Sequence, residues 1–171
     1  NTSETNYKGI GDKGIFLTKR FDRDKDERIH MASAMTMLGI KDGSDSGDYL
    51  QIAEVLRTYG SNPDKDLKEL WRRMAIGYII NNTDDHLRNH AFLLGENGWK
   101  LSPVYDINPN PYQANSLPIE APYVERNLEN LLVYSRQFGV DANEAKEYLL
   151  ETPNIIEKKM SQYAEMYRLS K

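Results

Sequence analysis

The chain has 171 residues, of which 39% are hydrophobic and 28% charged, as in one ordinary globular domain with a sizeable core. A net charge of −4 argues against a general nucleic-acid binder, and the absence of cysteine excludes disulfides and thiolate metal sites. No signal peptide is recognised and the longest apolar run, MAIGYII, is too short to span a membrane, so a cytoplasmic protein is expected. The chain begins with Asn1 rather than an initiator methionine, which predicts that it is part of a longer protein.

The first part of the chain is predicted to contain loops and one strand. Residues 1–13 are polar and carry glycines, which favours an N-terminal loop. The alternation of apolar and polar residues in GIFLTKRF predicts a strand at 14–21, and the charged run FDRDKDER ends it as a solvated loop. Residues 30–38 fit either a short helix or an irregular loop, and 41–48 are typical of a turn-rich loop.

Helical spacing of apolar residues begins after this loop. It predicts a helix over 48–59 and a second helix up to about Ile80. Asn62 suits the N-cap of the second helix, and Pro63 suits its first position. AFLL and GWKLS then flank the glycine-rich turn GENG, which predicts a β-hairpin over 91–102.

The last third is predicted to be helical after a loop rich in proline and asparagine. Residues 127–138 form one predicted helix, which Gly139 closes. DANE has the spacing of a capping box and opens a helix to about 151, and a further helix is predicted over 154–169. The whole chain is therefore expected to be mainly α with a small β component, in the α+β class.

The stretch NNTDDHLRNHAFLLGENGWKLSPVYD, residues 81–106, concentrates polar side chains between apolar runs. Any single Asp or Asn here is equally well explained as a cap or turn residue. Taken together, however, Asp84 and Asn89 stand five apart, and the predicted hairpin brings Asp106 back beside Asn89. Carboxylate and amide oxygens suit Mg²⁺, and Asp84 can accept a proton from a hydroxyl. This order of residues is the layout of a protein-kinase active site.

The motifs NTDDHLRNHAFL and GWKLSPVYDINPNP resemble the HipA-like family of bacterial serine/threonine protein kinases, which includes toxins of HipA/HipB toxin–antitoxin systems. RFDR, YLQIAEVLRTYG, LKELWRRMAIGYIINNTDDH and NLENLLVYSRQFGV also resemble the C-terminal domain of that family, so that residues 14–171 are taken as this domain. The resemblance implies a protein-kinase-like C-terminal lobe with a β-hairpin beside the catalytic loop. It also implies transfer of the γ-phosphoryl group of ATP to a protein hydroxyl, with ATP and Mg²⁺ as cofactors.

The resemblance also implies roles for individual positions. Asp84 matches the catalytic aspartate, and Asn89 and Asp106 match the Mg²⁺ ligands. As Mg²⁺ ligands, Asn89 and Asp106 also belong to the nucleotide site. Four further positions match residues with which the family contacts nucleotide: His86, Leu87, Arg88 and Tyr105. The hinge segment that holds adenine, largely through its main chain, is matched by Lys19, Arg20 and Phe21, and Asp22 lies where the family approaches the ribose.

The chain departs from a complete kinase in one respect. Nothing in it supplies a phosphate-covering loop or the lysine of an N-terminal lobe, because the glycines at 9, 11 and 14 do not form a phosphate loop. A separate N-terminal lobe is therefore expected as a partner of this chain. The resemblance also implies an unidentified protein substrate and a DNA-binding antitoxin as partners. Contact with a membrane or directly with nucleic acid is not expected.

Two alternatives stay open. His86 and His90 are four apart, and with Asp106 they would make the two-histidine, one-carboxylate metal site of a hydrolase, although Asn89 then has no role. The second alternative is a kinase-like lobe kept only for binding. In the preferred interpretation His90 is structural, and Arg72 and Arg73 lie on the solvated face of their helix.

Overall fold

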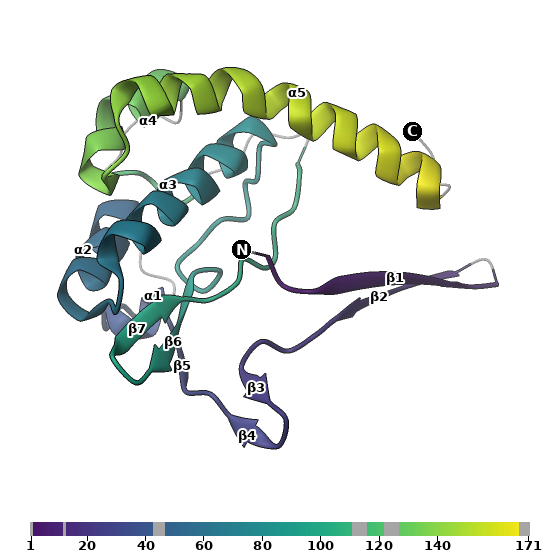
Figure 1. The fold of residues 1–171 in the computed structure, drawn as a ribbon, viewed down its shortest axis with the longest axis horizontal. Coiled ribbons are helices and arrows are strands. Elements are labelled where there is room, and N and C mark those ends of the chain that lie inside the picture. The colour runs from purple at the N-terminus through teal and green to yellow at the C-terminus, as the bar shows by residue number, and fades with distance from the viewer. Residues whose placement is uncertain (1, 12, 43–46, 111–115, 122–126, 168–171) are drawn as a thin grey trace.

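The structure is a computed structural model that describes residues 2–11, 13–42, 47–110, 116–121 and 127–167. Its main helices gather into one body, a small sheet lies at the edge of that body, and a hairpin of two strands projects away from it (Figure 1). The helices are α1 (Ala34–Met37), α2 (Tyr49–Tyr59), α3 (Pro63–Ile79), α4 (Leu128–Tyr134), the 3₁₀ helix η1 (Ser135–Phe138) and α5 (Ala142–Tyr167). The strands are β1 (Thr5–Ile10), β2 (Lys13–Thr18), β3 (Arg23–Asp24), β4 (Glu27–Arg28), β5 (Met31–Ser33), β6 (Ala91–Gly95) and β7 (Gly98–Leu101).

The helices α2 and α3 form where their caps and apolar stripes predict them. The Asp48 side chain accepts a hydrogen bond of 2.7 Å from the Gln51 amide, and Asn62 caps α3 with Pro63 at its first position. Their apolar stripes meet α4, η1 and α5 in one core. The largest side chains with almost no exposure include Trp71, Tyr49, Phe92 and Phe138. The Trp71 indole also donates 3.1 Å to the Leu131 carbonyl, so the core fixes α3 against α4.

The C-terminal part is one helix where the sequence predicted two. The predicted helix over 127–138 is confirmed as α4 followed by η1, and Gly139 ends it in the left-handed region at φ 71°. The break expected before residue 154 is wrong, because α5 continues through Pro153. A proline removes one N–H donor from the helix, and the buried Leu149 and Thr152 hold the preceding turns against the core. Residues 168–169 of the predicted last helix lie outside the described residues.

A three-stranded antiparallel sheet β5–β6–β7 lies beside the helical body. The predicted hairpin at 91–102 is confirmed, with Phe92 opposite Leu101 and Gly95 opposite Gly98. Residues 30–38 adopt neither predicted form alone, since they contain the strand β5 and then the single-turn helix α1. A three-residue strand is too short to show an alternating pattern, and it is defined by its pairing with β6.

The loop expected over residues 1–13 is wrong for β1, which pairs with β2 from Thr5 opposite Thr18 to Ile10 opposite Lys13. Neither strand buries a face, so β1 shows no apolar alternation that would reveal it. The strand expected at 14–21 is β2, which is shorter. The charged run FDRDKDER contains the small hairpin β3–β4 and is exposed over most of its length. Of the loop predicted at 41–48, residues 43–46 lie outside the described residues.

Within the described part of the chain, none of the helices is both long enough and apolar enough to cross a membrane.

Candidate functional site

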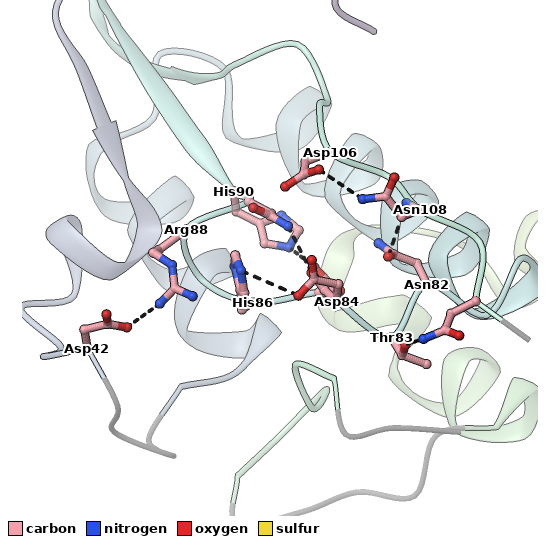
Figure 2. A network of polar contacts seen from close by, with 12 residues as sticks. Asp42, Asn82, Thr83, Asp84, His86, Arg88, His90, Asp106 and Asn108 are labelled. Atoms are coloured by element: carbon pink, nitrogen blue, oxygen red, sulfur yellow. Dashed lines mark hydrogen bonds and ion pairs between the residues drawn. The ribbon is translucent and has the colours of Figure 1, made fainter. Parts of the chain in front are cut away.

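Residues 81–90, the first part of the polar stretch, form an irregular segment between α3 and β6 (Figure 2). Asn81 follows the end of α3 with φ 53°, a left-handed conformation that asparagine tolerates better than most residues. The Asn82 amide then donates 2.8 Å to the Gly77 carbonyl, which reverses the chain against the end of the helix. Residues 82–90 contain no helix, so their side chains are placed by individual hydrogen bonds and not by a helical repeat.

Asp84 and Asn89 are linked directly. The Asn89 side-chain amide donates 3.0 Å to the Asp84 carbonyl, and the Asn89 backbone amide donates 2.9 Å to the His86 carbonyl. Asn89 is buried, whereas the Asp84 side chain is 68% exposed. The loop thus presents the Asp84 carboxylate to solvent and holds the Asn89 amide on the inner side.

Asp106 reaches the same place from the other side of the hairpin. It follows β7 with φ 56°, and its Oδ1 accepts 3.0 Å from the Asn108 side-chain amide. This left-handed conformation is uncommon for a residue other than glycine. Asn89 and Asp106 line one small cavity, together with Tyr49, Arg73, Gly77, Asn82, Asp85, His90, Val104, Tyr105 and Ile107. The structure therefore brings the predicted metal ligands together and joins Asp84 to one of them.

The donor set at this cavity fits a hard cation that also binds phosphate. The Asn89 amide nitrogen is already engaged by the Asp84 carbonyl, which leaves its side-chain oxygen as the acceptor for a ligand. Asp106 adds a carboxylate whose second oxygen is not used by Asn108. One amide oxygen and one carboxylate suit Mg²⁺, which takes most of its other ligands from water and phosphate.

The two histidines do not join Asp106 in a metal site. His90 Nε2 lies 2.8 Å from Asp85 Oδ1 in a buried contact, and His86 Nε2 lies 4.0 Å from Asp84 Oδ1. Among the described residues no group of three or more His, Cys, Asp or Glu side chains is arranged to hold a metal ion. The hydrolase alternative therefore loses the cluster that it requires.

Three residues matched to the nucleotide site, Phe21, Arg88 and Tyr105, contact one another beside Asp106. The rings of Phe21 and Tyr105 form an aromatic wall there. The rings of Phe21 and Tyr105 lie 5.5 Å apart, and the Tyr105 hydroxyl donates 2.7 Å to the Arg88 carbonyl. Burial, with a smaller contribution from the Asp106 carboxylate, raises the pKa of Tyr105, so the hydroxyl stays protonated and remains a donor. The Arg88 guanidinium forms an ion pair with Asp42.

The charged residues assigned to the hinge form ion pairs, and Leu87 of the loop is buried. The Arg20 guanidinium donates 2.8 and 2.6 Å to the two carboxylate oxygens of Asp22, and Arg23 adds a contact of 2.7 Å. The hydrogen bonds from Arg20, with smaller contributions from the charges of Arg20 and Arg23, lower the pKa of Asp22 to about 2. Lys19 pairs with Glu4 at an exposed position. Leu87 packs in the hydrophobic core, so its side chain supports the loop from inside.

Arg73 corrects one expectation. Arg72 is exposed as predicted, but the Arg73 side chain is only 5% exposed. It donates 2.7 Å to the Ser102 carbonyl and 3.0 Å to Glu69 Oε1, and burial lowers its pKa despite this pairing. Arg73 anchors the segment that leads from β7 to Asp106. Helical spacing could have revealed it, since it stands four residues after Glu69 and four before Gly77, beside the apolar stripe.

Comparison with known proteins identifies the family. The family described as "HipA-like C-terminal domain" matches residues 1–160. The chain belongs to this family. The resemblance found in the motifs is therefore confirmed, and the family covers the hairpin β1–β2 as well as the helical body.

The relatives are longer than this chain. A "Putative kinase" of Haemophilus influenzae is 30% identical over 165 residues, which cover 85% of this chain and 48% of the relative. The "Putative kinase Y4mE" of Sinorhizobium fredii is 28% identical over 103 residues, covering 54% and 24%. The chain thus spans about half the length of the first of these curated relatives and less of the second.

A solved structure shows the same fold. The matching chain comes from the complex of HipA, HipB and operator DNA of Shewanella oneidensis, with a TM-score of 0.70 and 16% identity. The match covers 87% of this chain and 42% of that one. The predicted fold class, a mainly helical, kinase-like lobe with a small β component, is confirmed by this likeness.

Proposed function

We propose that this chain is the C-terminal lobe of a serine/threonine protein kinase. In the longer protein, whose N-terminal lobe is not part of residues 1–171, it would transfer the γ-phosphoryl group of ATP to a hydroxyl of a protein substrate. The observation that carries the proposal is the shared cavity of Asn89 and Asp106, with Asp84 bonded to Asn89 and its carboxylate exposed. Membership of the HipA-like family and relatives named as kinases support it.

Each residue has a defined task in this proposal. The exposed Asp84 carboxylate would orient the acceptor hydroxyl and take its proton. Asn89 and Asp106 would hold Mg²⁺, which, when bound, neutralises charge on the nucleotide phosphates. The bond from Asn89 to the Asp84 carbonyl keeps the proton acceptor and the metal ligand at a constant separation, as a transfer that depends on positioning requires.

The nucleotide would lie beside the rings of Phe21 and Tyr105 and along the hinge. Phe21 and Tyr105 offer an aromatic surface beside Asp106. The hinge residues Lys19 and Arg20 would offer main-chain groups to adenine, although the Lys19 amide already donates 2.9 Å to the Glu4 carbonyl. Asp22, His86, Leu87 and Arg88 complete the proposed nucleotide site, Leu87 from within the core. Asp22 is already held by two guanidinium groups, so a ribose hydroxyl would add to an existing cluster.

The partners and the location are also proposed by analogy. The Shewanella structure contains HipB and operator DNA besides HipA, which supports a DNA-binding antitoxin as a partner of the longer protein. A cytoplasmic location stays a proposal. The names of these relatives and of the Shewanella structure do not mention a protein substrate, so the substrate stays unidentified.

One assay separates the proposed function from the alternatives. The longer protein is incubated with γ-labelled ATP, with and without Mg²⁺, and both ADP release and label on protein are measured. A kinase gives Mg²⁺-dependent ADP release with labelled protein, a hydrolase gives ADP and free phosphate, and a binding module gives neither. Either of the last two results contradicts the proposal.

A further inference from the structure

A buried polar cluster supports the candidate catalytic loop from inside. His90 Nε2 lies 2.8 Å from Asp85 Oδ1, and the Tyr49 hydroxyl from α2 donates to the other carboxylate oxygen. The rings of Tyr49 and His90 meet edge to face with centroids 5.1 Å apart. The Asp85 and His90 side chains are 10% and 5% exposed, so the carboxylate and the imidazole are both withdrawn from water.

The residues of this cluster are sequence neighbours of the proposed functional residues. Asp85 directly follows Asp84, and His90 directly follows Asn89. The contact between Asp85 and His90 therefore closes the same loop that the bond from Asn89 to the Asp84 carbonyl closes, one residue further along. The loop has two parallel cross-links, of which one involves the proposed functional residues and the other lies beneath them.

The inner cross-link is also fixed to the rest of the fold. The Leu117 amide donates 2.9 Å to the Asp85 carbonyl, and the Ala34 amide donates 2.7 Å to the His90 carbonyl. Tyr49 at the start of α2 holds the carboxylate itself. Both ends of a segment without helix or strand are thus tied to separate parts of the fold, the Asp85 end to Leu117 and the His90 end to α1.

Stability alone does not account for such a cluster. Removing a carboxylate from water costs several kcal/mol, and replacement of buried ionic groups by apolar side chains of similar volume is often neutral or stabilising. A well-packed apolar pair would fill the same space, but it would not set the orientation of the two residues next to it. Hydrogen-bonded groups behind a site commonly perform this task.

We propose that Asp85 is a positioning residue, which through His90 and Tyr49 fixes the distance between the proton acceptor Asp84 and the metal ligand Asn89. Asp85 touches neither substrate nor metal in this role. The inference rests on the proposed function for the identity of those two neighbours. Its consequence is a loop whose metal affinity depends on a side chain that lines the same cavity but is held by Tyr49 and His90 and does not bind the metal.

The test compares Asp85→Ala with Asp48→Ala in the longer protein. Asp48 is a matched control, because it is also a buried aspartate with two hydrogen bonds, from the Gln51 and Ala121 amides, but it does not line the cavity. Affinity for Mn²⁺ with ATP is measured by electron paramagnetic resonance, at a temperature where circular dichroism shows both variants folded. Asp85→Ala should weaken Mn²⁺ binding by about 10- to 100-fold, and Asp48→Ala should lower only the melting temperature.

A second pair of variants keeps the test decisive if Asp85→Ala does not fold. His90→Gln retains a side-chain donor for Asp85, whereas His90→Phe retains the ring volume without one. The glutamine variant should bind Mn²⁺ at least about tenfold more tightly than the phenylalanine variant. Equal affinities for these two, or equal losses for Asp85→Ala and Asp48→Ala, would overturn the positioning role.

The outcome also separates this inference from the proposed function. Wild-type protein that binds Mn²⁺ and ATP but transfers no phosphate would refute the kinase function, and the four affinities would still decide the role of Asp85. Wild-type protein that binds no Mn²⁺ would overturn both. Where transfer is observed, Asp85→Ala should lower kcat more than it raises the KM for ATP, because the adenine wall of Phe21 and Tyr105 is untouched.

Discussion

At the scale of single residues, the two conformational demands of the site fall on Asn81 and Asp106. Both adopt positive φ, at 53° and 56°, and one stands at each side of the segment that carries the polar groups. Asparagine and aspartate tolerate this region better than other side chains, although at some cost in strain.

The first prediction concerns the three residues that the structure gathers. In the longer protein, Asp84→Ala should reduce phosphoryl transfer by at least about 10²-fold, because the acceptor hydroxyl loses its orienting base. Asn89→Ala and Asp106→Asn should lose the stimulation by Mg²⁺, and asparagine is chosen at position 106 because it tolerates the left-handed backbone. The measurement is initial-rate transfer of labelled phosphate at several Mg²⁺ concentrations.

The control for these variants is Asp64→Ala. Asp64 is an exposed acid in the first turn of α3, outside the cavity, and its loss should leave the rate within about twofold. Activity retained by Asp84→Ala, or an unchanged Mg²⁺ response in both metal-ligand variants, would contradict the assignment of the site.

The second prediction concerns the Asp22 cluster. Its folded pKa of about 2 lies below the ordinary value of 3.8, so the unfolded state binds more protons between these values. The cluster therefore contributes stability above about pH 4 and loses that contribution as the pH falls toward 2. Arg20→Gln should move the Asp22 pKa back toward 3.8, because Arg20 donates two of its hydrogen bonds.

The measurement for Asp22 is an NMR titration of the side-chain carboxyl carbons between pH 1.5 and 6. Arg23→Gln serves as the comparison, since Arg23 donates a single bond to the carboxylate, and it should shift the pKa less than Arg20→Gln. An Asp22 that titrates near 3.8 in the wild-type chain would show that the cluster does not persist in solution.

At the scale of elements, α5 is where sequence and structure disagree most, and Pro153 is the residue that tests the difference. In a continuous helix this proline lacks a donor for the Leu149 carbonyl. Pro153→Ala should restore that bond, raise the helical signal in circular dichroism and slow amide exchange over residues 154–167. The gain in stability should be on the order of 1–3 kcal/mol if the distal half unfolds with the body.

Asn154→Ala is the control for Pro153→Ala, because it changes an exposed neighbour without restoring a hydrogen bond. It should alter stability by no more than about 0.7 kcal/mol. If both variants change helicity and exchange equally, the helix is interrupted at residue 153, as the sequence pattern alone suggested.

The elements that sequence predicted well are those whose ends carry chemical signals. Asn62 and Pro63 mark the start of α3, and the GENG turn marks the hairpin β6–β7. The strand β1 has no comparable signal, since its pairing with β2 buries neither face and its side chains follow no period. The course of α5 through Pro153 depends on packing against the core, which no local pattern reveals.

The candidate site divides in the same way. Asp84, Asn89 and Asp106 could be found from spacing around a hairpin, because that spacing follows from how a hairpin returns the chain. The contact of Asp85 with Tyr49 joins residues 36 apart through tertiary packing, so it could not be read from any local pattern. Arg73 was misplaced because arginine is rarely buried, and its burial is tolerated because it pairs with Glu69 and donates to the Ser102 carbonyl.

At the scale of the whole molecule, the hairpin β1–β2 projects away from the helical body (Figure 1). The strand β2 leads directly to the hinge residues, and its Ile15, Phe16 and Leu17 are all exposed. A two-stranded hairpin is marginally stable by itself in water, and apolar side chains exposed together often mark a contact surface. In the proposed longer protein, this hairpin is where the N-terminal lobe would join and close the nucleotide cleft.

The last prediction concerns residues 1–171 alone. The chain offers main-chain groups at the hinge, the aromatic wall of Phe21 and Tyr105, and two metal ligands, Asn89 and Asp106. Mg²⁺ with so few protein ligands depends on phosphate oxygens, and the sequence predicts no phosphate-binding loop in this chain. We expect Mg²⁺–ATP to bind only in the high micromolar to millimolar range, roughly −4 to −6 kcal/mol, with no measurable turnover. Transfer requires positioned charge in a site closed to water, and a single lobe supplies neither closure nor phosphate contacts.

Isothermal titration calorimetry measures the affinity of residues 1–171 for Mg²⁺–ATP, and a labelled-phosphate assay measures the turnover. Asp106→Asn is the control, which should abolish the metal-dependent part of binding. Submicromolar affinity for ATP, or phosphorylation of any protein by this chain alone, would mean that the active site is complete within these residues.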